Sequence, residues 1–239
     1  MNPCRDMSSD LARPVRRGEL AFTMIEVAVS IAIVAFALVA ILGVLPTGIN
    51  VQRENREDTI IAHDANFFLE AILSGTNSAS FVILATNMDF LDVTIAGVHQ
   101  GTQTPSFTNG NLSPDRIVSY LSMPQLGGNS AFGRFRSFSS SLADRAAGTN
   151  GVAFTYLVTT EISPVADYTS TLAGYTNYAR YLTNNLFDVR LHFRWPVFGD
   201  GTNYTLGNGR LTVRRLVSGA LIQDTNALYN FVPGAFFGP

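Results

Sequence analysis

Apolar residues fill almost every position from Ala21 to Leu45, and Glu26 is the only charged residue among them. From Val27 to Leu45 there is no charge. A helix over that stretch, at ~1.5 Å per residue, spans roughly 28 Å, about the hydrocarbon thickness of a bilayer. The pattern therefore predicts a transmembrane helix over residues 22–45.

Residues 46–75 are predicted to continue this helix as an amphipathic segment. Pro46, between Gly43 and Gly48, predicts a bend or loosened turn near 43–48. An apolar helix face then follows, which is predicted to pack on a sheet; it comprises Ile61, Ala65, Phe68, Leu69 and Ile72. Gly75 is predicted to cap the C-terminal end, so the whole helix, from Phe22 to about Ser74, would measure on the order of 80 Å.

Residues 76–239 are predicted to form a β-rich head, which makes the fold α+β: a long N-terminal helix against an antiparallel sheet. The segment from Gly97 to Gly151 is rich in Gly, Ser, Asn, Thr and Pro, which predicts long loops with one short element at Ile117–Leu121. Strands are expected at Phe81–Leu84, Phe90–Ile95 and Val152–Ile162, and a surface excursion at Asp167–Tyr181.

The clearest strand pattern runs from Leu186 to Val197, where apolar and charged residues alternate strictly. Pro196 predicts the end of this strand or an edge position. A turn is expected over residues 198–203, followed by a second strand, Gly209–Val217, that pairs back antiparallel. The apolar tail, residues 231–239, would either dock on a neighbouring molecule or complete the surface of its own head.

Three interpretations fit the apolar run. A cleaved secretory signal has a shorter apolar core and a small-x-small cleavage site, neither of which is present here. A plain signal anchor fits the length but leaves Glu26 unexplained, unless the carboxylate lies at the level of the lipid headgroups. A carboxylate deeper in the membrane is costly without a partner, so Glu26 is by default a functional residue.

The third interpretation rests on the residues before the run. Arg16-Arg17-Gly18-Glu19-Leu20-Ala21 followed by Phe22-Thr23-Met24-Ile25-Glu26-Val27 resembles the prepilin signature of type IV pilins and type II secretion pseudopilins. The resemblance implies a leader peptide, residues 1–21, that a prepilin peptidase removes between Ala21 and Phe22. The new amine of Phe22 would be methylated, and Glu26 would stand fifth in the mature chain. Ala21 departs from the glycine that is usual before the cut.

The chemistry of this signature is a charge pair in an apolar setting. Cleavage creates a cationic amine on Phe22, and the Glu26 carboxylate of a neighbouring subunit would neutralise it, because either charge is costly to bury alone. The resemblance thus gives Phe22 and Glu26 a role in assembly. It implies as partners a prepilin peptidase/methyltransferase, other pilin or pseudopilin subunits, an inner-membrane assembly platform and the lipid bilayer.

The composition fits one membrane helix and one globular domain. The chain has 239 residues, of which 46% are hydrophobic and 14% charged, and its formal net charge is −2. This small net charge argues against nucleic acid as a partner. All 16 basic residues are arginine, and those of the leader place the N-terminus in the cytoplasm and the head outside, by the positive-inside rule. Cys4, the single cysteine, lies in the leader, so the mature chain would contain no disulfide.

Other chemistry finds little support in the sequence. His63, His99 and His192 lack the spacing of metal ligands, and the Asp200–Asn203 segment has too few carboxylates for a calcium loop, so we expect a plain turn. The sequence contains no nucleophile elbow and no phosphate loop. We therefore expect no enzyme activity, no metal and no cofactor.

The resemblance implies a structural subunit of such a fibre, and because the head is large for a major subunit of that family, we expect a minor pilin or pseudopilin. The Arg194–Pro196, Gly207–Arg210 and Val217–Gly219 segments also resemble pilin-like proteins called Verru_Chthon cassette proteins. The alternative is a single-pass membrane protein that does not polymerise and whose head binds a ligand or partner.

Overall fold

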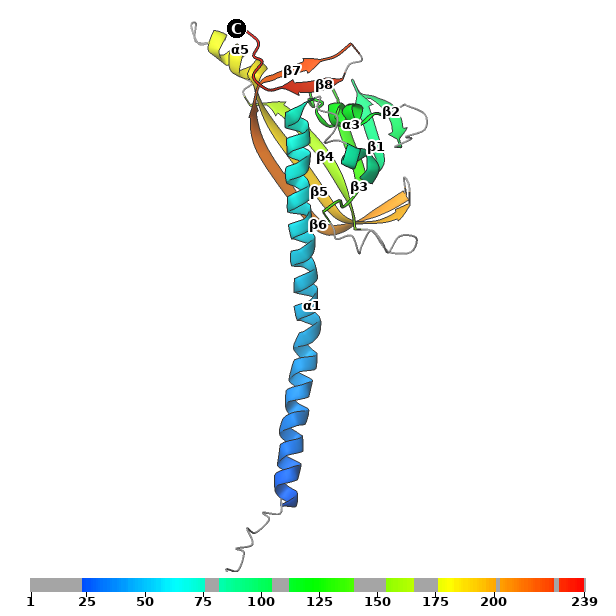
Figure 1. Cartoon of the computed structure of the whole chain (residues 1–239), viewed down its shortest axis with the longest axis vertical. Coiled ribbons are helices and arrows are strands. Elements are labelled where there is room, and N and C mark those ends of the chain that lie inside the picture. Colours follow the sequence, from blue (N-terminus) through cyan, green and yellow to red (C-terminus); the bar gives the residue numbers. More distant parts are fainter. Residues whose placement is uncertain are drawn as a thin grey trace, which may run out of the picture. The chain divides into compact units, whose positions relative to one another are not determined.

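The computed structural model describes residues 23–75, 82–104, 112–139, 154–165, 176–200, 203–225 and 228–238 (Figure 1). The leader and Phe22 lie outside these residues. The chain divides into two compact units, residues 1–53 and 54–239, and helix α1 (Met24–Ser74) contributes to both. The second unit is the head.

Helix α1 is continuous from Met24 to Ser74. The loosened turn predicted near residues 43–48 does not break it, because Pro46 removes a single backbone donor and the flanking residues keep their helical conformation. Gly75 ends the helix with a φ of 62°, which confirms the predicted cap. A Cβ atom at Gly75 would lie 2.5 Å from the Phe231 carbonyl oxygen, so a side chain has no room there.

The head contains a six-stranded antiparallel sheet with the order β2-β1-β3-β4-β5-β6. Its strands are β1 (Met88–Ile95), β2 (Val98–Gln103), β3 (Ser130–Arg136), β4 (Thr155–Pro164), β5 (Leu186–Asp200) and β6 (Asn203–Ser218). A separate hairpin pairs β7 (Ala220–Gln223) with β8 (Tyr229–Val232). The other helices are α2 (Val82–Asn87), α3 (Pro114–Leu121) and α5 (Thr176–Asn185). The predicted α+β class, a long helix on an antiparallel sheet, is confirmed.

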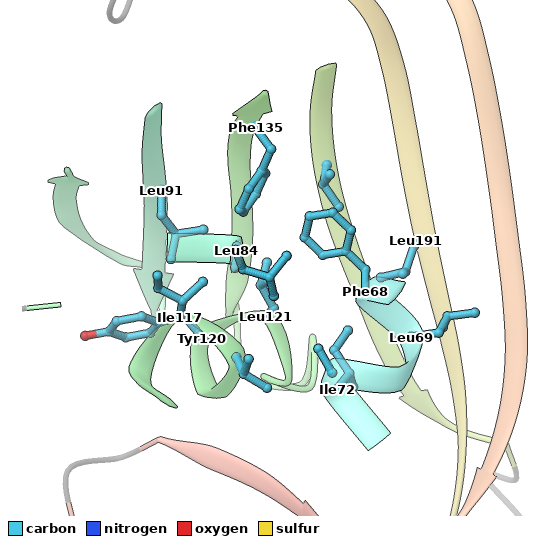
Figure 2. Packing of buried hydrophobic residues seen from close by; sticks show 14 of the residues in the cluster. Phe68, Leu69, Ile72, Leu84, Leu91, Ile117, Tyr120, Leu121, Phe135 and Leu191 are labelled. Carbon is cyan, nitrogen blue, oxygen red and sulfur yellow. The ribbon is translucent and has the colours of Figure 1, made fainter. Parts of the chain in front are cut away.

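Phe68 joins α1 to the middle of the sheet. Its ring centroid lies 4.9 Å from that of Phe135 on β3, 6.3 Å from that of Tyr156 on β4 and 5.8 Å from that of Phe193 on β5. Figure 2 shows Phe68, Leu69 and Ile72 of α1 beside the strands. All five residues of the predicted helix face are buried, so this prediction is confirmed.

Helices α2 and α3 cover the β1 and β3 side of the same sheet face. Leu84, Ile117 and Leu121 point into the space between these helices and the strands (Figure 2). The head therefore has two layers around one main apolar core, with helices on one side and the sheet on the other (Figure 1).

The strand predictions with the most regular patterns are confirmed. Phe90–Ile95 lies within β1, Val152–Ile162 overlaps β4, and Leu186–Val197 lies within β5. Gly209–Val217 lies within β6 and pairs antiparallel with β5, as predicted.

Two predictions for the first half of the head are wrong. The segment predicted as a strand at Phe81–Leu84 is helical from Val82, and its Leu84 and Ala85 are buried together on one helix face; Phe81 lies outside the described residues. The segment predicted as loops, Gly97–Gly151, contains β2, α3 and β3. Its predicted short element at Ile117–Leu121 is the second part of α3. Residues 105–111 and 140–153 lie outside the described part.

The loop prediction was wrong because it treated the glycines of this segment as turn residues. Gly133 lies inside β3, where an added Cβ would stand 2.8 Å from the Phe135 ring and 3.0 Å from the Leu91 side chain. The glycine therefore serves close packing within a strand, not a turn. In the predicted excursion Asp167–Tyr181, residues 176–181 belong to α5, and residues 167–175 lie outside the described part.

Pro196 does not end β5, which continues to Asp200, but it lies beyond Arg194, the last residue of β5 that pairs with β4. Of the two predictions for Pro196, the edge position is therefore the one that the ladder bears out. The register of β5 with β6 shifts between Trp195 and Val197. This irregularity accommodates the missing backbone donor of proline. The turn predicted over 198–203 is also shorter than expected, since residues 198–200 and 203 still pair in the ladder; residues 201–202 lie outside the described part.

The C-terminal tail packs on its own head. The Asn185 side chain accepts a hydrogen bond from the Phe237 backbone N–H (2.7 Å) and donates one to the Phe237 carbonyl (2.9 Å). The Phe236 ring stacks on Tyr181 of α5, with centroids 6.3 Å apart. The tail therefore completes the surface of its own head, which is one of its two predicted roles.

Candidate functional site

The N-terminal part of α1 is an exposed apolar surface. Every residue from Val27 to Leu45 is exposed within the chain. In the described part of the chain, α1 is the one helix long and apolar enough to cross a membrane, judged by length and composition. It is compatible with a single-pass membrane anchor.

Thr23 builds the first turn of this helix. Its carbonyl accepts hydrogen bonds from the backbone N–H of Glu26 (3.0 Å) and of Val27 (3.2 Å), and its side-chain oxygen lies 3.3 Å from the Glu26 nitrogen. Thr23 and Glu26 have the spacing of a capping box, Thr-x-x-Glu. Sequence analysis missed this role of Thr23, although the spacing alone would have indicated it.

Glu26 is the predicted assembly residue that the structure describes. It lies in the first turn of α1 and is exposed. The positive end of the helix dipole favours a carboxylate at this position. Ala21 and Phe22, the predicted processing residues, lie outside the described residues.

No other ionisable residue accompanies Glu26 between Met24 and Gln52. Ser30, one turn further along, donates its hydroxyl to the Glu26 carbonyl at 2.7 Å, so this polar side chain is satisfied within the helix. Glu26 is therefore the one point of charge on a long apolar surface.

One buried carboxylate of the head lies on α1. Asp64 is fully buried and accepts hydrogen bonds from the hydroxyls of Tyr156 on β4 (2.9 Å) and of Ser139. Burial, together with the negative charge of Asp64, raises the pKa of the Tyr156 phenol well above its ordinary value. The contact joins α1 to the middle of the sheet. Asp64 lies three residues after Ile61 and four before Phe68, a spacing that would have placed it on the buried face.

A second set of charges lies on the sheet face that points away from α1. The Asp188 carboxylate accepts hydrogen bonds from Arg190 (Nη2, 2.7 Å) and from Arg214 (Nε, 2.7 Å). Burial alone would raise the pKa of Asp188, but the hydrogen bonds and charges of Arg214 and Arg190 outweigh it. The pKa of Asp188 therefore lies below its ordinary value of 3.8.

This pKa shift predicts a pH dependence of stability. Because the pKa is lowered in the folded head, Asp188 stabilises the fold above pH 3.8, and this contribution is lost as the pH falls through the lower folded value. The thermal unfolding temperature of the wild type should therefore fall in this range, and Asp188→Asn should remove part of that fall. Glu70→Gln, at an exposed carboxylate of α1, serves as the matched control and should leave the pH profile unchanged. An identical profile for Asp188→Asn would contradict the assignment.

The three histidines lie apart, next to different carboxylates. His99 contacts Asp92 at 2.9 Å, His192 contacts Glu161 at 3.1 Å, and exposed His63 lies 3.9 Å from Asp64. Within the described residues, no group of three or more His, Cys, Asp or Glu side chains could hold a metal ion. The expected absence of a metal stays a prediction.

Comparisons with known proteins give no further assignment. No protein-family model matches the chain, and no curated protein and no solved structure matches it. The fold and the helix define an α+β protein with one long, exposed, apolar N-terminal helix that continues into a β-rich head.

Proposed function

We propose that this chain is a structural subunit, a minor pilin or pseudopilin, of a type IV pilus-like or type II secretion fibre. The observation that carries the proposal is the position of Glu26, a lone carboxylate in the first turn of an exposed apolar helix. A prepilin peptidase would cut between Ala21 and Phe22 and methylate the new amine. The protein has no enzymatic role in this proposal.

The physical basis is the pairing of two opposite charges, each of which would be costly to bury alone in apolar surroundings. The N-terminal amine of one subunit and the Glu26 carboxylate of its neighbour would neutralise each other between packed helices. Such a pair fixes the register of subunits, because any other register leaves a charge unpaired. The apolar side chains from Val27 to Leu45 would supply the packing around it.

The proposed location follows from the same helix. Before assembly the subunit would wait in the cytoplasmic membrane, with the N-terminus in the cytoplasm and the head on the outer side. There it would meet the prepilin peptidase, the assembly platform and other subunits. The long helix on a sheet supports this proposal, because the head is then held directly by the helix that packs in the fibre.

The decisive test is the intact mass and the N-terminal sequence of the protein purified from its native membrane. We expect a chain that begins at Phe22 and carries one extra methyl group. The variant Ala21→Asp should block the cut and leave the full leader, because a charged residue replaces the small one at the cleavage site. A wild-type chain that still begins at Met1 would contradict the proposal and favour a signal-anchored binding protein.

A further inference from the structure

A hollow lies in the head where α1 runs past strands β5 and β6. Its volume is about 370 Å³, within the range of about 300–1,000 Å³ that is usual for small-ligand sites. All of its lining residues belong to the head unit. They are Glu54, Glu57 and Asp58 of α1, Trp195 and Pro196 of β5, and Asn208, Gly209 and Arg210 of β6.

A bulge in the ladder between β5 and β6 forms one side of this hollow. Gly207 and Asn208 of β6 together stand opposite Pro196 of β5, at the point where the register shifts. Such a bulge leaves ladder groups unpaired and re-aims side chains. The exposed side chain of Asn208 has no hydrogen-bond partner among the residues that the structure describes.

Trp195 brings a hydrogen-bond donor to the hollow. The residue is only 4% exposed, yet its indole N–H has no partner within the described part of the chain. A Cβ atom added at Gly209, which also lines the hollow, would stand 2.5 Å from the indole Nε1. Nε1 is not sealed from solvent, so it faces the hollow. Because a buried indole N–H ordinarily finds an acceptor, an occupant of the hollow would supply one.

The α1 side of the hollow is negative. Glu54 and Asp58 form no ion pair and no hydrogen bond with any described residue. They are four residues apart, so the two like charges are neighbours on the helix surface. Leu211 packs against the core, so the side chain of the preceding residue, Arg210, points to the other sheet face and does not neutralise them. A cation in the hollow would relieve this repulsion.

The chemistry of the occupant follows from these two features together. It needs a positive charge for the acids and an acceptor for the indole N–H. A metal ion does not fit, because no group of three or more His, Cys, Asp or Glu side chains in the described residues could hold one. An arginine within a polypeptide has both parts: a planar fork of donors that suits carboxylates, and a backbone carbonyl that accepts a hydrogen bond.

We propose that this hollow binds a basic segment of a partner polypeptide. An arginine guanidinium of the segment lies against Glu54 and Asp58, and a backbone carbonyl accepts the hydrogen bond of Trp195. The segment can come from another protein or from a second copy of this chain, since both present the same chemistry. The site does not depend on fibre assembly and goes beyond the proposed function.

Trp195 is the single tryptophan of the chain, so its fluorescence reports directly on the hollow. The full-length chain in detergent is titrated with acetyl-Gly-Arg-Gly-amide, a peptide without tryptophan. We expect a saturable change in Trp195 emission, and none with acetyl-Gly-Glu-Gly-amide. No saturable change with the arginine peptide, or an equal change with the glutamate peptide, would overturn the proposal.

Variants of the acids test the same contact. Glu54→Gln and Asp58→Asn together should weaken binding of the arginine peptide by at least about tenfold, because two charged acceptors are lost. Both residues are exposed, so the head should still fold. Glu70→Gln, at an exposed acid of α1 outside the hollow, is the matched control and should bind like the wild type. Equal binding by the double variant would overturn the role of the acids.

Protein concentration distinguishes the two sources of the segment. Without peptide, an emission change that grows as the chain is concentrated, and that the double variant lacks, assigns the segment to a second copy. Emission that is independent of concentration, together with peptide binding, assigns it to another protein. Peptide binding by a protein that retains its leader would overturn the proposed function and support this site.

Discussion

Glu26→Ala should leave the protein in the membrane and abolish its incorporation into a fibre. The apolar stretch after Glu26 is still long and apolar enough to span a bilayer, so membrane insertion should not depend on the carboxylate. Assembly does, because the amine of a neighbouring Phe22 would be buried without a counter-charge. Breaking such a buried pair costs about 3–5 kcal/mol, enough to lower incorporation by more than about a hundredfold. Membrane fractionation and immunoblotting of sheared fibres measure the two outcomes separately.

The control for this variant lies one turn away. Ser30→Ala removes a hydroxyl that donates its hydrogen bond to the Glu26 carbonyl, and it should assemble like the wild type. Glu26→Gln keeps the shape of the side chain without its charge and should fail like Glu26→Ala. Normal fibres from Glu26→Gln would show that the charge is dispensable and would contradict the proposed pairing.

Phe68→Ala should produce the largest loss of head stability. Phe68 is fully buried, and its ring contacts aromatic residues of β3, β4 and β5. Truncating a buried phenylalanine in such a core costs about 3–5 kcal/mol. For a domain of this size the thermal unfolding temperature should fall by on the order of 10 °C. Circular dichroism of the detergent-solubilised chain at the strand wavelength measures this change.

Phe198→Ala is the matched control, because Phe198 is 51% exposed and lies near the end of β5. Removing its ring should change the free energy of unfolding by about 0.5 kcal/mol or less. Equal unfolding temperatures for the two variants would mean that α1 contributes little to the head's core, against the packing described above.

The sequence predicted correctly those elements in which apolar residues recur with a single helical or strand period. The apolar face of α1 after Pro46 and the alternation in β5 each follow from local repeats, and both are found in the structure. Short elements were predicted poorly, because four apolar residues suit a strand or a helix equally. Val82–Asn87 is helical because one face of this helix packs against α3. Those residues lie about 30 positions later in the chain, so the contact is not visible in the local sequence.

The candidate site was predictable only in part. Glu26 stands out because a single charge interrupts an apolar run, and no tertiary structure is needed to notice it. The contact between Asp188 and Arg214 depends on the register between β5 and β6, which the shift near Pro196 alters. No sequence pattern tells by how many residues the register shifts. The residues that face each other across β5 and β6 could therefore not be derived from the sequence.

The strand order has a consequence for how the head folds as the chain is synthesised. After the β1–β2 hairpin, β3 pairs with β1, and β4, β5 and β6 then each pair with the strand before them in the chain. A chain that emerges from its N-terminus can therefore extend the sheet one strand at a time, with α1 already present as a template. At each stage the newest strand offers an open edge that invites aggregation. Growth ends at β6, where the exposed Arg210 and Arg215 place positive charges on the last edge and discourage another strand from joining.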